Sequence, residues 1–523
     1  MGAYGGRRPA AKLGLWWGYL PLVLVSGLVV AMVYIVPSEV PDAATGGGGG
    51  TPTVKGENES ASGWGESVTG CPDRQKQVEG DGYSPPCFAF AQGADNGGET
   101  THGVTKDTIT VTYRMTPDNN LLKLLASTLG TTWDEPDSLL PETAEGLVDY
   151  FNKNFQFYGR KLQLKQVQGA GSFVAEFTGG GQEQASSDAI KAHDAGAFAD
   201  VTGLTQPYSE ALTRQKVVNI GAPYMSREWF TKERPYAWSN FPDCSVVAEV
   251  ATEFGVKSVL GRPAKYAGGD IAGRNREIGL VIPDNLEYQQ CGDAGEKVIK
   301  DAGMKFKYRG KYVLDLTKMD PQADSLVAAL RDKGVTSVAC GCDPIMLSKL
   351  AQKAEEANYF PEWLIIGVGF IDLDLVGQMV SKVAPDQWKH AFGGSPSGAQ
   401  QPFNQSDGYK AYKSVHPDKE PSILVDIVYY QLYQLAIGIQ MAGPNLTPEN
   451  FETGMFSYPV GQGPAGRWDF APNHYTGASD ARVVWWDPDQ PSLFNGEPGT
   501  YRDTGERFKQ GELPEGELKV FQP

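Results

Sequence analysis

The chain has 523 residues, which is enough for about two to four domains of ordinary size. Asp and Glu outnumber Lys and Arg by 63 to 46, so the formal net charge is −17 and the sequence pI is about 4.9. Nucleic-acid binding depends on clustered cations that neutralise phosphates, and because the sequence shows no such cluster we expect no nucleic-acid partner. The 63 glycines and 35 prolines place much of the backbone in turns and linkers.

A long apolar segment near the N-terminus predicts a membrane anchor. Residues 1–12 contain three basic residues, and residues 13–36 carry no charge. A helix over 13–36 would reach roughly 36 Å, enough to cross a bilayer. The charges on either side predict a short cytoplasmic tail at 1–12 and an extracellular bulk. The alternative is a cleaved signal peptide, whose apolar region is normally only about 7 to 15 residues. We therefore predict a single-pass protein of the cell membrane.

Residues 37–102 are rich in Gly, Ser, Pro and acidic residues and show no apolar periodicity. This composition predicts a flexible linker between the anchor and the folded part of the chain.

Six cysteines in a chain expected outside the cell predict disulfide bonds. They are Cys71, Cys87, Cys244, Cys291, Cys340 and Cys342. Cys71 and Cys87 are neighbours in the linker and are expected to pair. The other four allow three pairings, which the sequence leaves open. Cys340 and Cys342 lack the second Cys pair or the His that a zinc site needs, so we predict no metal.

From residue 103 onward, strand and helix patterns alternate, which predicts a parallel α/β architecture. The expected elements of the first unit are strand 108–113, helix 143–155, strand 161–167, helix 182–193, strand 197–201, helix 209–215 and strand 217–220. Those of the second unit are helix 245–254, strand 278–282, helix 292–302, strand 311–314, helix 320–333, strand 335–339, helix 345–358 and strand 363–366. Two such units in series suggest two lobes with a ligand cleft between them.

Two motifs bear on chemistry. Residues 461–466 match the spacing of a dinucleotide-binding loop, but Pro464 interrupts it and residues 467–470 resemble a strand rather than a helix. We therefore predict a turn and no cofactor. Asp372 and Asp374 could supply two carboxylates to a metal-dependent hydrolase, but neither a third acid nor a positioning glycine completes a calcium loop. A solvated loop is the preferred interpretation, and we do not expect an enzyme.

Several strings occur in an order that is typical of one family. They are 103–109 (GVTKDTI), 199–203 (ADVTG), 217–223 (VVNIGAP), 236–243 (YAWSNFPD), 278–284 followed by Glu287 and Tyr288, 451–456, 463–470 and 483–485. Together they resemble the type I periplasmic solute-binding proteins, specifically the leucine/isoleucine/valine-binding proteins that feed ABC importers. The resemblance covers roughly residues 103 to 489.

The resemblance implies an α/β fold of two Rossmann-like lobes joined by a three-strand hinge, which closes on a small ligand. It places the first lobe at 103–238, the second lobe at 239–399 and the return to the first lobe at 400–458, where a helix over 423–441 packs. Residues 459–523 would then hold the hinge return, a second-lobe strand and a C-terminal tail.

The resemblance also implies the ligand-binding residues. They are Trp133, Thr202, Gly203, Thr205, Tyr224, Met225 and Ser226 from the first lobe, and Tyr288, Asp343 and Phe370 from the second. Hydroxyls and backbone amides of the first lobe would hold a ligand carboxylate, which suits the N-terminus of a helix. The acid that pairs with a ligand ammonium in the family falls here on Gly369, so Asp343 or Asp372 would have to replace it.

We therefore expect a membrane-anchored extracellular protein that captures a small amino-acid-like or carboxylate-like ligand and delivers it to an ABC permease, without a cofactor. Two alternatives remain. One is a sensor of the same fold that signals to a membrane partner when its lobes close. The other is a metal-dependent extracellular hydrolase that uses Asp372 or Asp374.

Overall fold

The computed structural model describes residues 75–91, 93–116, 135–177, 179–222, 224–367, 371–517 and 519–521. The predicted cytoplasmic tail, membrane anchor and first part of the linker lie outside these residues, as do Cys71, Trp133 and Phe370. None of the helices in the described ranges combines the length and apolar character that a bilayer crossing requires.

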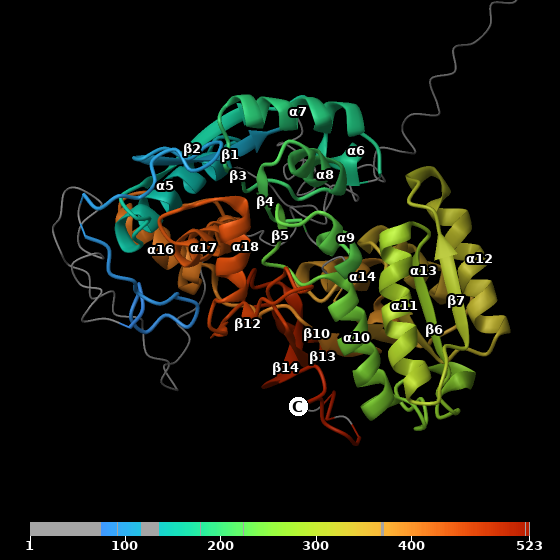
Figure 1. The fold of residues 1–523 in the computed structure, drawn as a ribbon. Coiled ribbons are helices and arrows are strands. Elements are labelled where there is room, and N and C mark those ends of the chain that lie inside the picture. The colour runs from blue at the N-terminus through green and yellow to red at the C-terminus, as the bar shows by residue number, and fades with distance from the viewer. Residues whose placement is uncertain are drawn as a thin grey trace, which may run out of the picture.

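The first lobe contains a five-stranded parallel sheet with the strand order β2-β1-β3-β4-β5 (Figure 1). Its strands are β1 (Thr108–Met115), β2 (Lys161–Gln168), β3 (Ala199–Asp200), β4 (Val218–Ile220) and β5 (Ala237–Trp238). The helices between them are α5 (Leu139–Asn154), α6 (Phe173–Phe177), α7 (Gln182–Asp194), α8 (Gln206–Arg214) and α9 (Arg227–Lys232). The predicted alternation is confirmed, since Leu147 and Phe151 of α5 are fully buried against the sheet core.

The second lobe contains a seven-stranded mixed sheet with the order β14-β13-β10-β9-β8-β6-β7. Its strands are β6 (Ile278–Pro283), β7 (Tyr308–Tyr312), β8 (Ser337–Cys340), β9 (Glu362–Ile365), β10 (Ala391–Ser395), β13 (Asp480–Pro491) and β14 (Pro498–Lys509). Its helices are α10 (Cys244–Phe254), α11 (Leu286–Asp301), α12 (Met319–Asp332), α13 (Pro344–Glu356), α14 (Asp374–Val383) and α15 (Pro385–Trp388). Short helical turns are η2 (Gly255–Val259), η3 (Gly269–Ile271), η4 (Leu316–Lys318) and η6 (Phe403–Gln405). Neighbouring strands from β7 through β6, β8 and β9 to β10 are parallel, whereas β13 pairs antiparallel with both β10 and β14.

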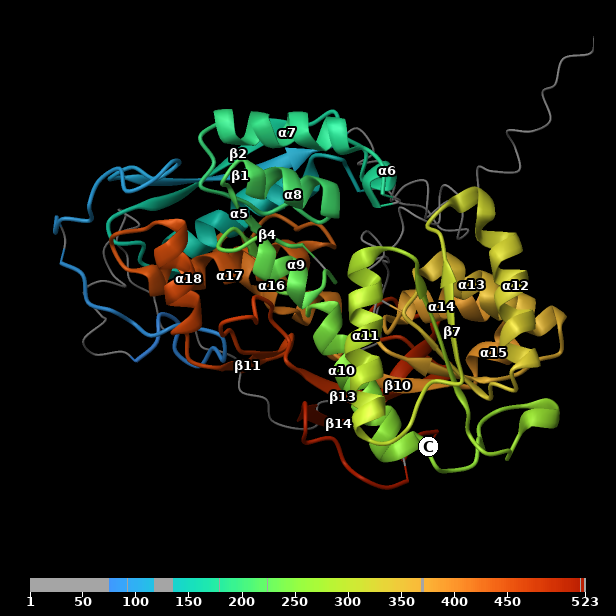
Figure 2. The same cartoon turned by 45° about the vertical axis from the view of Figure 1, so that its right-hand side comes forward.

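The chain passes between the lobes three times. It enters the second lobe after β5, returns after β10 and enters the second lobe again through a hairpin that leads to β13. The returning helices are α16 (Asp407–Val415), α17 (Val425–Ala442) and α18 (Pro448–Phe456), and they pack on the first lobe beside α5 (Figure 2). The hairpin consists of β11 (Gly461–Gly463) and β12 (Gly466–Trp468), so the glycine motif at 461–466 is a turn, as predicted.

Part of the predicted linker belongs to the folded structure. The Tyr83 side chain is only 1% exposed, and its hydroxyl donates a hydrogen bond to the backbone oxygen of Gly466 at 2.6 Å. Its ring lies 4.6 Å from that of Trp468. We call residues 75–91 and 93–102 the strap. The composition of the strap does not predict that it packs on the fold, because single aromatic residues such as Tyr83 hold it in place and leave no periodic apolar pattern.

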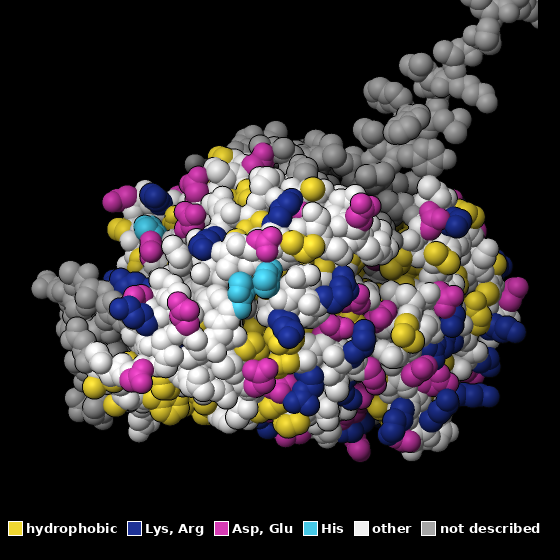
Figure 3. Space-filling model, turned by 45° about the horizontal axis from the view of Figure 1, so that its top comes forward, with side chains coloured by type: hydrophobic (Ala, Val, Ile, Leu, Met, Phe, Trp, Pro, Cys, Tyr) yellow, Lys and Arg dark blue, Asp and Glu magenta, His cyan; other side chains and the backbone are white. Residues whose placement is uncertain are grey.

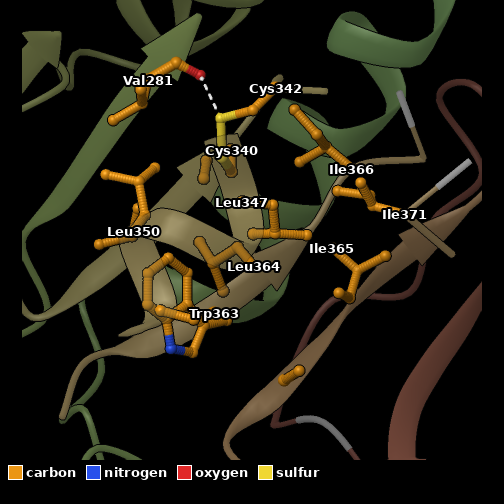
Figure 4. Packing of buried hydrophobic residues seen from close by; sticks show 14 of the residues in the cluster. Val281, Cys340, Cys342, Leu347, Leu350, Trp363, Leu364, Ile365, Ile366 and Ile371 are labelled. Atoms are coloured by element: carbon orange, nitrogen blue, oxygen red, sulfur yellow. Dashed lines mark hydrogen bonds between the residues drawn. A yellow bond between two sulfur atoms is a disulfide. The ribbon is translucent and has the colours of Figure 1, made fainter. Parts of the chain in front are cut away.

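The structure resolves the cysteine pairings that the sequence left open. Cys244 pairs with Cys291, which joins α10 to α11, and Cys340 pairs with Cys342 at the end of β8. Figure 4 shows this second pair in the apolar core of the second lobe, where the Cys342 Sγ lies 3.5 Å from the backbone oxygen of Val281. Cys87 is also disulfide-bonded, while its predicted partner lies outside the described residues.

Candidate functional site

A pocket opens between the two lobes, beside the segments that connect them. It holds about 1000 Å³, counting the space that is open to solvent at its mouth. Its walls come from the first lobe, from all three connecting segments and from the second lobe. Representative lining residues are Tyr224 and Tyr430 of the first lobe, Phe241 and Gln400 of the connections, and Leu373 and Phe494 of the second lobe. A ligand in this pocket would therefore contact both lobes.

Aromatic side chains form the apolar part of the pocket. Tyr224 has a φ of 56°, a left-handed conformation that is uncommon for a bulky residue and often marks a functional position. Its ring lies 6.3 Å from that of Phe241, and both pack against the disulfide between Cys244 and Cys291. The disulfide thus supports the floor of the pocket from the second lobe.

Two carboxylates are the charged groups of the pocket. Asp407 begins α16 and accepts a hydrogen bond from the Tyr430 hydroxyl at 3.0 Å. Asp426 lies in the first turn of α17 and accepts one from the backbone N–H of Gly408 at 2.7 Å. Burial raises the pKa of both groups, and that of Asp426 reaches about 7. The pocket therefore holds one carboxyl group that changes its charge near neutral pH.

The substitution Asp426→Asn is expected to alter how stability depends on pH. Burial raises the folded-state pKa from 3.8 to about 7, an effect to which Asp407 adds and which Lys410 opposes. The stability that this carboxyl contributes is fully present below about pH 4 and is lost as the pH rises to about 7. Urea unfolding of both proteins from pH 4 to pH 8 checks this. The free energy of unfolding of the variant, relative to that of the unsubstituted protein, should increase as the pH rises. A difference that stays constant from pH 4 to pH 8 would contradict the prediction.

The predicted hydroxyls of the first lobe are engaged within the protein. The Thr202 hydroxyl donates to Asp200 at 2.6 Å. The Thr205 hydroxyl donates to Glu176 at 2.5 Å, and Glu176 in turn binds the buried guanidinium of Arg114. Gly203 lets the buried side-chain amide of Asn219 lie close to the backbone. A Cβ at residue 203 would lie 1.8 Å from the Asn219 Oδ1 and would clash with it. These residues share one end of the sheet, but carboxylates already accept the hydrogen bonds of both hydroxyls.

Of the three remaining predicted residues of the first lobe that the structure describes, two lie at the contact between the lobes. Tyr224 lines the pocket, whereas Met225 is buried in the core of the first lobe. Ser226 caps α9 and donates a hydrogen bond to Gln290 of α11 at 2.6 Å. Beside it, Arg227 binds Glu249 of α10 through two hydrogen bonds of 3.0 and 2.8 Å. We call this pair of charged residues the clasp.

Two predicted residues of the second lobe, Tyr288 and Asp343, lie close to each other and are not among the residues that line the pocket. Asp343 caps α13 and accepts hydrogen bonds from the backbone N–H groups of Ile345 and Met346. It also accepts one from the Tyr312 hydroxyl at 2.7 Å. Tyr288 is near, and burial with the charge of Asp343 raises the pKa of its hydroxyl. Because Asp343 is fully engaged, it is a poor replacement for the missing acid of the family pattern.

The two carboxylates suggested for a hydrolase hold the second lobe together. Asp372 accepts a hydrogen bond from Ser395 at 2.6 Å, and it is 1% exposed. Asp374 accepts hydrogen bonds from the backbone N–H of Tyr501 and from the Thr500 hydroxyl, both at 2.7 Å. The expected solvated loop is thus wrong for both residues, because β14 and β10 cover them. Across the described ranges, no group of three or more His, Cys, Asp or Glu side chains is arranged to hold a metal.

Sequence reasoning missed most of the pocket. Asp407, Asp426, Tyr430 and Phe494 were not among the predicted site residues. One signal was present, since Asp426 is the single charged residue of α17, which is otherwise made of apolar and aromatic residues and three glutamines. An acid in such a helix is seldom buried unless it has a partner or a function.

No family model and no curated protein matches the sequence. Solved structures match over most of the chain. One is a solute-binding protein of an ABC transporter from R. palustris in complex with 4-hydroxybenzoate, with a TM-score of 0.53 and 12% sequence identity. The alignment covers 79% of this chain and 100% of that chain. The leucine-, isoleucine-, valine-, threonine- and alanine-binding protein from Brucella ovis has a TM-score of 0.52 and 14% identity, with 78% and 97% covered.

A third structure, the fatty acid ABC transporter substrate-binding protein from Thermomonospora curvata, has a TM-score of 0.51 and 13% identity, with 80% and 97% covered. The chain therefore has the type I periplasmic binding protein fold, and the resemblance seen in the sequence is confirmed at the level of the fold.

Proposed function

We propose that this protein is an extracellular solute-binding protein that captures a small organic ligand between its lobes and delivers it to an ABC-type permease. The observation that carries the proposal is the pocket itself, which is lined by both lobes and by the segments that connect them. In this fold, rotation of the lobes about the connections buries the ligand. The affinity therefore depends on contacts that form only in the closed state.

We place the protein at the cell membrane, with residues 13–36 as its anchor and the lobes outside the cell. The apolar length of this segment and the basic residues before it support this orientation. The disulfides at Cys244–Cys291 and Cys340–Cys342 support an oxidising compartment. On the face shown in Figure 3, basic and acidic side chains are interspersed, so this face offers no basic surface to a nucleic acid.

We further propose that the protein binds its ligand without converting it. Asp374 accepts hydrogen bonds from Thr500 and the backbone of Tyr501, Asp372 accepts one from Ser395, and neither carboxylate is among the residues that line the pocket. Two of the similar structures described above are named as substrate- or solute-binding proteins of ABC transporters, and the third is named as an amino-acid-binding protein.

Native mass spectrometry of the full-length chain, before and after unfolding, tests the function. We expect one small organic molecule per chain, released unchanged. A ligand that binds only the folded state stabilises it by RT ln(1 + [L]/Kd), about 2.7 kcal/mol at a hundredfold excess over Kd, so the released molecule should raise the unfolding midpoint when added back. A molecule that is converted during incubation would contradict the proposal.

The clasp is expected to favour the closed arrangement of the lobes. Glu249→Gln removes the charge that holds Arg227, whose side chain is 33% exposed, so the affinity for the ligand should fall by about two- to fivefold. The radius of gyration from small-angle X-ray scattering of the ligand-free variant should increase. The control is Asp301→Asn, which breaks the exposed pair with Lys297 on α11. Equal effects of the two substitutions would show that the clasp does not act on closure.

A further inference from the structure

Resting on the proposed function, we infer that the ligand carries a protonated primary or secondary amine, held in the interlobe pocket by Asp426, Asp407 and Asn240. This inference names a ligand class that differs in charge from the benzoate named with one of the similar structures. It follows from the charge, the unpaired hydrogen-bonding capacity and the ring surfaces of the pocket.

The charge of the pocket is negative without a compensating cation. Asp407 and Asp426 line it, while none of the Lys, Arg or His residues in the described part of the chain does. Lys410, one turn further along α16, is exposed and does not line the pocket; its charge lowers the pKa of both carboxyl groups, but burial outweighs it. A buried and a partly buried carboxylate with no cation among the lining residues are unfavourable, because burial penalises the ionised forms. A ligand cation would relieve this penalty.

Asn240 supplies a second, independent observation. Its side chain is 8% exposed and lines the pocket, and its Oδ1 has no hydrogen-bond partner within the described residues. A buried acceptor without a partner is rare in folded proteins and calls for a donor that is absent from the chain itself. An ammonium group with N–H bonds provides such donors. A quaternary ammonium has no N–H bond, and a tertiary ammonium has only one for the three acceptors Asp426, Asp407 and Asn240, so a primary or secondary amine fits these groups best.

The remaining walls suit the body of such a ligand. The rings of Tyr224, Phe241, Tyr430 and Phe494 line the pocket. Their faces attract a cation and also offer apolar surface to a hydrocarbon or aromatic body. The Tyr430 hydroxyl donates to Asp407, which fixes this carboxylate on the wall of the pocket.

A carboxylate ligand does not fit the same groups. It would add a negative charge beside Asp407 and Asp426, and it could not supply the donor that the Asn240 Oδ1 lacks. The hydroxyls of Thr202 and Thr205, which were expected to hold a ligand carboxylate, donate to Asp200 and Glu176 instead. The residues that the pocket presents therefore select a cation.

Calorimetry and thermal unfolding of the full-length chain test the inference with probes that differ only in charge. The probes are benzyl, phenethyl and n-hexyl skeletons, each as the primary amine, the alcohol, the carboxylate and the trimethylammonium. We expect at least one primary amine to raise the unfolding midpoint and to bind more tightly than its three counterparts. Binding should weaken by about 10- to 100-fold in Asp426→Asn and in Asn240→Ala, as expected for the loss of a hydrogen bond to a charged group.

Matched variants separate binding from folding. Asp418→Asn changes the same charge on an exposed position of the first lobe and should leave amine binding within about twofold. Asn240→Ala removes an unpaired acceptor, so it should not lower the unfolding midpoint of the ligand-free protein. Asp407→Asn provides a second carboxylate variant, whose oxygen still accepts the Tyr430 hydrogen bond.

Three outcomes would overturn the inference. If a carboxylate or alcohol bound more tightly than its amine, or if native mass spectrometry released a ligand without an amine, the inference would fail while the proposed function stood. If amine binding were unchanged in both Asp426→Asn and Asn240→Ala, the amine would bind elsewhere and the inference would fail. If no probe bound and no organic molecule co-purified, the proposed function would fail as well.

Discussion

Replacement of Glu362 by Gln is expected to lower the free energy of unfolding by about 3–5 kcal/mol. Glu362 is fully buried in β9 and binds the guanidinium of Arg276 through two hydrogen bonds of 2.6 and 2.7 Å. Its oxygens also accept hydrogen bonds from the Ser337 hydroxyl and from the backbone N–H of Tyr266. The variant leaves the Arg276 cation, which is 7% exposed, without its counter-ion in the core of the second lobe.

Urea unfolding, together with hydrogen exchange of β8 and β9, measures this loss and assigns it to the second lobe. Glu277→Gln is the matched control, because Glu277 forms an exposed pair with Lys307 close by, with side chains 43% and 41% exposed. Pairs of this kind contribute about 0–1 kcal/mol. The prediction is wrong if the two variants lose similar amounts.

Replacement of Tyr83 by Ala is expected to lower the free energy of unfolding by about 3–5 kcal/mol, through the loss of a fully buried ring. That ring contacts Trp468 in β12 as well as Tyr430 and Tyr433 in α17, at centroid distances of 4.6, 6.0 and 6.2 Å. Because Tyr430 and the turn that precedes β12 line the pocket, the same variant should weaken ligand binding, whereas a loss confined to the strap would leave binding unchanged.

Tyr83→Phe separates the two contributions of this side chain. It keeps the ring and removes the hydrogen bond to the Gly466 oxygen, so we expect a loss of about 1–2 kcal/mol. Phe88→Ala, at a residue of the strap that is 40% exposed, serves as the control and should cost less than about 1 kcal/mol. Thermal unfolding and protease cleavage of the strap measure both effects. If Phe88→Ala were as damaging as Tyr83→Ala, the strap would be held by its whole length rather than by Tyr83.

The strap and the pocket are connected through the hairpin of β11 and β12. Tyr83 donates to Gly466 in this hairpin, and the Tyr458 hydroxyl donates to the Tyr83 backbone oxygen at 2.7 Å. Pro464 and Ala465, at the turn of the hairpin, line the pocket. The strap therefore supports one wall of the pocket through its contacts with the hairpin.

The sequence by itself determined the alternation of strands and helices, because burial of one face of each element leaves a local periodic pattern. Residues 108–113 predicted β1, and Pro464 within the glycine motif predicted the turn between β11 and β12. The order of these elements, together with the local strings from 103–109 to 483–485, resembled the type I periplasmic solute-binding proteins and so indicated their fold. In contrast, β14 carries many charged residues and becomes a strand by pairing with β13, so its own sequence offers no strand pattern.

Only the tertiary structure decided which polar groups line the pocket between the lobes. Asn240 and Asp426 are far apart in the sequence and line one pocket because the connecting segment after β5 meets the first turn of α17. Thr205 carries a hydroxyl at the expected strand end, but the fold brings Glu176 within 2.5 Å of it. A hydrogen bond depends on distances of a few tenths of an ångström between segments distant along the chain. Local patterns record which residues are buried, whereas contacts between distant segments decide which of the buried polar groups lack a partner.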